Sequence, residues 1–258
     1  MSRAQFHRRQ VLSRYGKTIL IVNAALGAAL RTAAGGAART GALLGVLLAL
    51  AIGPAGASEP TRQLLVLGDS LTAGYGLPRE QSFPAQLEQA LRAAGHDVAV
   101  VNAGVSGDTT SGGLARLTWT LDGFPGGEPD AAIVELGAND ALRGLDPEPI
   151  FANLSAILAE FEQRRIPVLL TGMLAPPNLG EEYAEAFNAI YPRLAEEHDV
   201  LFYPFFLEGV AGTPQLNQSD GIHPNAQGVA RIVANILPSV KDLLRQARQA
   251  EQLGISER

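Results

Sequence analysis

The sequence predicts a single α/β domain, a three-layer α/β/α sandwich around a central five-stranded parallel sheet. Two observations support this prediction. Short aliphatic or β-branched runs alternate with longer amphipathic segments, and no repeat, low-complexity linker or second composition regime interrupts them. Strands that alternate with helices form parallel sheets. Each helix carries the chain back to the end of the sheet at which the previous strand began, so the next strand runs in the same direction. We expect strands at residues 64–67, 98–101, 131–136, 168–170 and 200–203.

The segments between these strands place apolar residues at helical spacing. The clearest is Pro147 to Arg165, in which Ile150, Leu154 and Phe161 fall on one face. Ser82 is expected to cap the helix that follows the first strand. We expect helices at residues 82–94, 110–121, 147–165, 181–197 and 225 to about 250.

Residues 1–57 differ in charge from the rest of the chain. They hold seven basic residues and no acidic one, whereas the remainder holds 13 basic and all 26 acidic residues, a formal charge of −13. An apolar run, Gly41 to Gly53, follows the basic part, and Pro54 to Ala57 is typical of a signal-peptide cleavage site. We therefore predict an export signal at 1–57, cleaved after Ala57, a single mature domain at 58–258, and a periplasmic or secreted protein.

Alternatives for this leader stay open. Arg8-Arg9-Gln-Val-Leu resembles a twin-arginine export signal, and Arg31 to Ala57 alone would form a complete signal peptide if translation starts further downstream. A retained membrane anchor is disfavoured, because the apolar run is shorter than the about 20 residues that span a bilayer.

Composition excludes several classes of function. The chain has no cysteine, which rules out disulfides, a thiolate nucleophile and a cysteine-ligated zinc site. Nucleic acid is not an expected partner of so acidic a body, because phosphate contacts require clustered Lys and Arg.

A candidate general base emerges from the four histidines. His7 lies in the leader, while His96 and His198 precede expected strands and are interpreted as solvated turn residues. His223 stands in Asp220-Gly-Ile-His-Pro, where the carboxylate can reach Nδ1 and fix the tautomer whose Nε2 accepts a proton. The same motif also fits a turn that caps the last helix, so alone it leaves both interpretations open.

Other polar signals stand at the ends of the first three strands. Ser70 follows the first strand in Gly68-Asp-Ser-Leu, and alone it is a helix cap as often as a nucleophile. Gly104 and Asn139 follow the second and third strands. Carboxyl ends of parallel strands meet where such sheets bind ligands. There the N–H groups of Ser70 and Gly104 and the Asn139 amide would supply three donors to an oxyanion.

Taken together, these motifs resemble the four blocks of the SGNH (GDSL) hydrolases, and within them the periplasmic arylesterase, acyl-CoA thioesterase I and lysophospholipase group. The similarity runs from about residue 62 to residue 240. It implies a flavodoxin-like SGNH hydrolase fold. It also implies these roles: Ser70 as nucleophile, His223 as base, Asp220 as its orienting acid, and Ser70, Gly104 and Asn139 as oxyanion donors. Ala138 departs from the Gly that close relatives often carry, and its methyl group would narrow the site.

We therefore predict a serine esterase for aryl or alkyl esters, including lysophospholipids, and for acyl thioesters. It would act as a monomer on a small-molecule ester or lipid, without metal or cofactor. Export separates the protein from cytosolic acyl-CoA, which favours esters as natural substrates. The Ala175 to Gly180 loop is expected to flank the acyl site.

Two other functions match parts of the sequence. An α/β-hydrolase would need Gly-x-Ser-x-Gly, and Gly104-Val-Ser-Gly-Asp fails at its last position. A non-catalytic, flavodoxin-like phosphate-binding protein could use the Ser70 to Gly76 turn. That alternative leaves Asn139 and the Asp220–His223 pair unexplained.

Overall fold

The computed structural model describes residues 61–256. Five parallel strands form one sheet in the order β2-β1-β3-β4-β5. Their bounds are β1 Arg62–Gly68, β2 Val98–Gly104, β3 Ala131–Glu135, β4 Val168–Thr171 and β5 Leu201–Tyr203. This is the flavodoxin-like strand order, so the predicted five-stranded parallel sheet and its fold class are confirmed.

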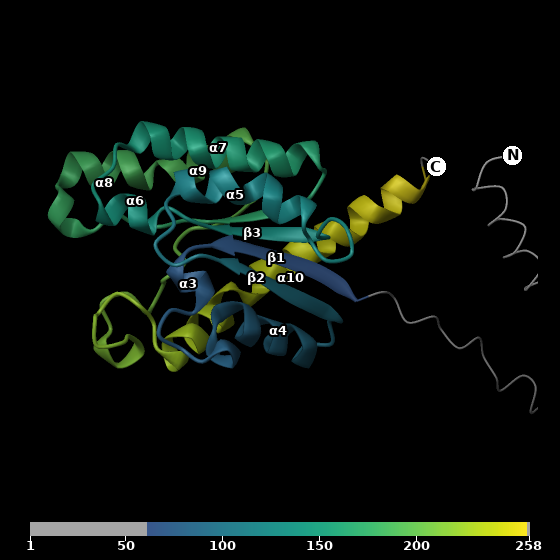
Figure 1. Cartoon of the computed structure of the whole chain (residues 1–258), viewed down its shortest axis with the longest axis horizontal. Coiled ribbons are helices and arrows are strands. Elements are labelled where there is room, and N and C mark those ends of the chain that lie inside the picture. Colours follow the sequence, from purple (N-terminus) through teal and green to yellow (C-terminus); the bar gives the residue numbers. More distant parts are fainter. Residues whose placement is uncertain (1–60, 257–258) are drawn as a thin grey trace, which may run out of the picture. The chain divides into compact units, whose positions relative to one another are not determined.

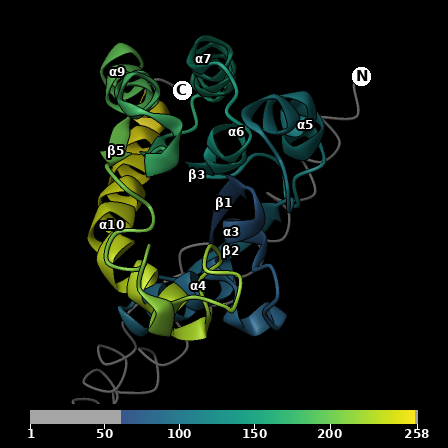
Figure 2. The same ribbon diagram turned by 90° about the vertical axis from the view of Figure 1, so that its left-hand side faces the viewer.

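Helices cover both faces of the sheet (Figures 1 and 2). The helices α4 Phe83–Ala93 and α10 Ala226–Ser256 lie side by side on one face. The other face carries α5 Thr110–Asp122, α7 Pro147–Gln163, α8 Glu181–Asn188 and α9 Ile190–Glu197. Two short helices, α3 Ser70–Ala73 and α6 Ala138–Leu142, follow β1 and β3 at their carboxyl ends. Three 3₁₀ turns complete the described chain, at Arg79–Gln81, Pro177–Leu179 and Pro214–Leu216.

The core lies in the middle of the sheet. Leu64 to Leu67 on β1 and Ala131 to Val134 on β3 are fully buried. Strands covered on both faces read as continuous apolar runs, which is why these two were visible in the sequence. On α7 the predicted apolar face, with Ile150, Leu154 and Phe161, is buried as expected.

Three local predictions need correction. The segment 181–197 forms two helices instead of one, because Pro192 has no N–H to donate to Asn188 and its ring crowds that carbonyl. Ser82 occupies the cap position of α4, but its hydroxyl donates to the Arg79 carbonyl instead of capping the helix. β2 continues three residues beyond the predicted end, as far as Gly104.

The export signal predicted at 1–57 and its cleavage site lie outside the described residues. Within residues 61–256, none of the helices has the length and apolar character needed to cross a membrane.

Candidate active site

Ser70 stands at the point where the strand order of the sheet reverses. β2 and β3 flank β1 on opposite sides, and such a switch point opens a crevice at the carboxyl ends of the strands. β1 ends at Gly68, Asp69 caps α3 by accepting the Leu71 N–H, and Ser70 is the first residue of that helix. The fold therefore presents the Ser70 hydroxyl at the edge where ligands bind.

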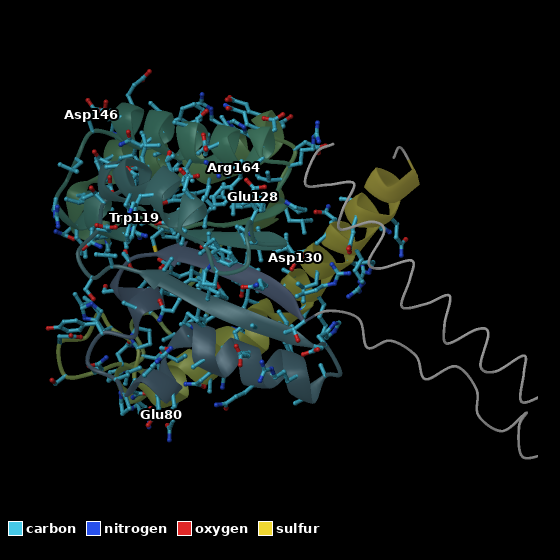
Figure 3. The ribbon with its side chains drawn as sticks, turned by 45° about the vertical axis from the view of Figure 1, so that its right-hand side comes forward. Glu80, Trp119, Glu128, Asp130, Asp146 and Arg164 are labelled. Carbon is cyan, nitrogen blue, oxygen red and sulfur yellow. The ribbon has the colours of Figure 1, made fainter. Side chains whose placement is uncertain are left out.

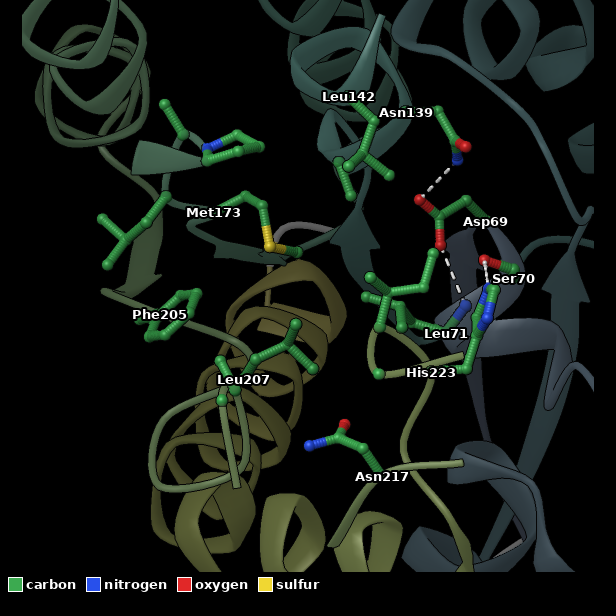
Figure 4. A pocket seen from close by; sticks show the side chains of 18 of the residues that line it. Asp69, Ser70, Leu71, Asn139, Leu142, Met173, Phe205, Leu207, Asn217 and His223 are labelled. Atoms are coloured by element: carbon green, nitrogen blue, oxygen red, sulfur yellow. Dashed lines mark hydrogen bonds between the residues drawn. The ribbon is translucent and has the colours of Figure 1, made fainter. Parts of the chain in front are cut away.

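His223 joins the Ser70 hydroxyl to the Asp220 carboxylate. Its Nε2 lies 3.0 Å from Ser70 Oγ, a contact drawn in Figure 4. Its Nδ1 lies 2.8 Å from Asp220 Oδ2. The Tyr75 ring covers the imidazole, with the ring centroids 4.5 Å apart. The structure thus brings together three predicted residues that come from opposite ends of the domain.

Asp220 is charged and fixes the imidazole tautomer. Its Oδ1 accepts the backbone N–H groups of His223 and Ile222, and these bonds, with that of the imidazole, lower the pKa of Asp220 to about 2. A carboxylate can only accept hydrogen bonds, so the bond at Oδ2 places the proton on Nδ1. In the neutral imidazole, Nε2 is then the acceptor for the Ser70 hydroxyl.

An apolar cleft of about 500 Å³ opens beside Ser70. Met173 follows β4, Phe205 and Leu207 follow β5, and Leu142 comes from α6 (Figure 4). The expected loop contributes through Ala175 to Pro177. Volumes of this size are usual for small-ligand sites, and apolar walls with a few polar groups suit a carboxylic acyl chain.

Asn139 reaches the same place from α6. Its Nδ2 donates to Asp69 Oδ2 and to the Asp108 carbonyl, both at 2.9 Å. Both N–H groups of the amide are therefore engaged. An oxyanion would share one of them in a bifurcated hydrogen bond, a common arrangement in proteins. Ser70 N–H donates no hydrogen bond within residues 61–256 and is free for this role.

Gly104 does not lie as the sequence analysis expects. Its N–H donates to Asn102 Oδ1 at 2.9 Å, and a Cβ at this position would overlap the backbone nitrogen of Ala73. The reason is the longer β2: Gly104 is its last residue and packs against α3, not against the cleft.

The turn that follows Gly104 does approach Asn139. Asp108 N–H closes this turn on the Val105 carbonyl, and the Asp108 carbonyl accepts the Asn139 amide. Within the described part of the chain, Gly107 N–H has no hydrogen-bond acceptor. The sequence signal for this donor was Val105-Ser-Gly-Asp, directly after the strand.

Two carboxyl groups beneath Ser70 were missed by the sequence analysis. Asp69 is fully buried, and burial raises its pKa to about 6. Glu135, the last residue of β3, accepts hydrogen bonds from the Thr72 hydroxyl and the Asp69 N–H. Burial also raises its pKa well above its ordinary value, and its Oε1 has no hydrogen-bond partner among residues 61–256. The sequence does contain a signal for both carboxyl groups: Glu135 is a polar residue at the end of an apolar strand, and Asp69 directly follows another strand.

His96 and His198 lie outside the cleft, in a loop and a turn as predicted. Both are partly buried, and His198 Nε2 forms a 2.9 Å hydrogen bond with Ser155 Oγ. In residues 61–256, no cluster of His, Cys, Asp and Glu side chains could hold a metal ion.

Comparison with known proteins gives the same family as the sequence motifs. The model of the GDSL-like lipase/acylhydrolase family matches residues 66–231, and the chain belongs to this family. The predicted SGNH/GDSL family and the predicted enzyme class, a GDSL-type serine esterase or thioesterase, are confirmed.

Three relatives show how far the similarity extends. An arylesterase of Vibrio mimicus is 45% identical over 184 residues, which cover 70% of this chain and 90% of the relative. Thioesterase 1/protease 1/lysophospholipase L1 of Escherichia coli K12 is 45% identical over 162 residues, 63% of this chain and 75% of the relative. The crystal structure of AlinE4, an SGNH-hydrolase family esterase, is 52% identical with a TM-score of 0.61, covering 72% of this chain and 97% of that one.

Proposed function

We propose that this protein hydrolyses carboxylic esters with apolar acyl groups, lysophospholipids among them, and acyl thioesters, through an acyl-enzyme on Ser70. One observation carries the proposal: the continuous hydrogen-bond chain from Ser70 Oγ through His223 to Asp220, at the mouth of an apolar cleft. A hydroxyl, a base within reach and a group that orients the base are the parts of an activated nucleophile.

The first half of the reaction acylates Ser70. His223 Nε2 takes the hydroxyl proton while Oγ attacks the acyl carbonyl carbon, and the carbonyl π electrons move onto oxygen. Ser70 N–H, the Asn139 amide and, in place of Gly104, the Gly107 N–H stabilise that oxyanion. The intermediate collapses, and the leaving alcohol or thiol departs with the proton from His223.

The second half releases the acid. Water enters at the position of the leaving group, and His223 Nε2 takes one of its protons as its oxygen attacks the acyl carbonyl carbon. The same donors stabilise the second oxyanion. Collapse then returns the proton to Ser70 Oγ and frees the carboxylic acid. Asp220 stays ionised throughout and stabilises the imidazolium that forms twice.

The substrate class follows from the walls of the cleft. Leu71, Met173 and Phe205 offer an acyl chain an apolar surface, and no Lys or Arg of residues 61–256 lines the cleft. A neutral or zwitterionic ester fits these walls better than a polyanionic coenzyme thioester. The activities named for the relatives, arylesterase and thioesterase/lysophospholipase, agree with this range. A phosphate-binding protein is disfavoured, because Asp69 and Asp220 would repel the anion.

The test uses two serines that each contact a histidine. Ser70→Ala should abolish turnover of p-nitrophenyl esters and covalent labelling by a fluorophosphonate. The matched control, Ser155→Ala, removes the hydroxyl that bonds to His198 and should leave both unchanged. Turnover or labelling that survives in Ser70→Ala would place the nucleophile elsewhere. An ester series from acetate to palmitate on the wild type would give the acyl length that the cleft accepts.

A further inference from the structure

Arg116 lies on α5, outside the cleft, and the proposed reaction does not use it. Its Nε donates to Asp108 Oδ2 at 2.7 Å, and its Nη2 donates to the Gly68 carbonyl at 3.0 Å. The side chain is 19% exposed and that of Asp108 is 17% exposed. The two acceptors belong to two different segments, the turn of residues 105–108 and the end of β1. Arg116 therefore ties these segments to each other.

The contact with Asp108 connects Arg116 to the proposed oxyanion donors. The Asp108 carbonyl accepts the Asn139 amide, and Gly107 immediately precedes Asp108. The Asp108 carboxylate also fits against Gly112, where a Cβ would stand 2.7 Å from Oδ1. A shift of Asp108 would thus turn the Asn139 amide and move the Gly107 N–H at the same time.

The contact with the Gly68 carbonyl connects Arg116 to the nucleophile. Gly68 stands two residues before Ser70, and its carbonyl also accepts the Val105 N–H at 3.0 Å. The guanidinium and the first residue of the turn consequently meet at one carbonyl oxygen. A planar guanidinium with fixed donor directions can hold a carboxylate and a carbonyl together, whereas a lysine ammonium offers one point charge.

We infer that Arg116 is a positioning residue of the proposed reaction, which holds the oxyanion turn in register with Ser70. The inference rests on the proposed function. Its consequence is specific: the oxyanion forms during the attack and is absent from the bound substrate, so displaced donors lower kcat and leave KM nearly unchanged. Arg143 also donates to the Gly107 carbonyl, at 2.8 Å. The turn therefore keeps one anchor when Arg116 is removed, and a partial loss of rate is expected.

Arg164 supplies a matched control. It is 20% exposed and forms ion pairs with Asp122, Glu128 and Glu160. It lies just before β4, at the edge of the sheet opposite the cleft, and Figure 3 shows it beside Glu128. Arg164→Ala therefore removes a paired guanidinium of the same exposure without touching the turn.

The experiment compares Arg116→Ala, Arg116→Lys and Arg164→Ala in full-length protein, with kcat and KM for p-nitrophenyl butyrate and thermal melts. We expect kcat of Arg116→Ala to fall by about 10- to 100-fold, below the cost of removing a donor outright, with KM within about twofold. Arg116→Lys should lie between this variant and the wild type, and Arg164→Ala should keep the wild-type kcat. Millimolar guanidinium chloride should partly restore kcat of Arg116→Ala and leave that of Arg164→Ala unchanged.

Several results would overturn the inference: a wild-type kcat in folded Arg116→Ala, a loss expressed in KM, or an equal loss in Arg164→Ala. If Arg116→Ala does not fold, the kcat and the thermal melt of Arg116→Lys test the inference instead. A lowered kcat with a wild-type melt supports positioning, and a wild-type kcat refutes it. Failure of the proposed function looks different, because the wild type would then be inactive or Ser70→Ala would keep its activity.

Discussion

The described part of the chain contains two serine–histidine–carboxylate arrangements, and they differ in almost everything except the first contact. Ser70 Oγ lies 3.0 Å from His223, whose other nitrogen lies 2.8 Å from Asp220. Ser155 Oγ lies 2.9 Å from His198, whose other nitrogen lies 3.9 Å from Glu162. Judged by the serine–histidine distance alone, the two are equivalent.

Their surroundings separate them. Ser70 stands at the switch point of the sheet, beside the apolar cleft and the amide of Asn139. Ser155 lies within α7 and His198 at the end of α9, and neither lines the cleft. Glu162 is 74% exposed, so its distant carboxylate does little to orient the ring. A serine–histidine contact thus acquires a chemical role only where a fixed acid, oxyanion donors and a substrate surface converge.

The largest expected effect tests the fixed acid. Asp220→Asn should lower kcat/KM by about 10³- to 10⁴-fold, because an amide can hold the imidazole in the wrong tautomer. The counterpart, Glu162→Gln, should leave kcat/KM unchanged. Initial rates on one p-nitrophenyl ester measure both variants. A loss below tenfold in Asp220→Asn would show that the backbone around His223 suffices to orient the ring.

The next effect tests the oxyanion donors. Asn139→Ala should lower kcat by about 10²- to 10³-fold with little change in KM, since its amide acts on charge that develops in the transition state. Asn153→Ala removes another half-buried amide, one that donates to Thr110 Oγ1, and should keep at least half of the activity. Steady-state kinetics separate kcat from KM. Equal losses in the two variants would mean that general destabilisation, not the oxyanion hole, explains the result.

The sequence predicted this fold well, because buried parallel strands and amphipathic helices leave strong local patterns. The apolar run at Leu64–Leu67 and the α7 stripe are visible without any tertiary information. The break between α8 and α9 was not predicted, although Pro192 is visible in the sequence and proline interrupts helices. The short helices α3 and α6 were missed because four or five residues carry too little periodicity to detect.

At the site, motif spacing located Ser70, Asn139, Asp220 and His223, which the fold then brings together. Gly104 was chosen because it closes the strand, yet its N–H donates to Asn102 Oδ1, a contact that the sequence does not reveal. Only the three-dimensional path of the next turn shows that the Asp108 carbonyl accepts the Asn139 amide, while the Gly107 N–H has no acceptor among residues 61–256. Arg116 gave no local signal, since its two acceptors lie 8 and 48 residues away in sequence.

The two arrangements also differ in the carboxyl groups near them, and this difference predicts how stability changes with pH. Beneath Ser70, burial raises the pKa values of Glu135 and Asp69, whereas Glu162 beside His198 is exposed. A carboxyl group whose pKa is raised by folding stabilises the fold fully below its unfolded pKa. That contribution is lost as pH rises toward the folded pKa. The pKa of Asp220 is lowered, so its contribution is lost only as pH falls toward about 2.

Glu135→Gln should therefore flatten the fall in the free energy of unfolding as pH rises above 4.5, the ordinary pKa of a Glu side chain. Glutamine keeps a carbonyl oxygen for the Thr72 hydroxyl and the Asp69 N–H, but it has no proton that the unfolded chain would release. The stability of the variant relative to wild type should rise with pH above this value, while Glu162→Gln should follow the wild-type curve. Urea unfolding at several pH values measures the slopes. Parallel curves for Glu135→Gln and wild type would mean that Glu135 is ionised in the folded protein, and its unpartnered Oε1 would then need a donor from solvent.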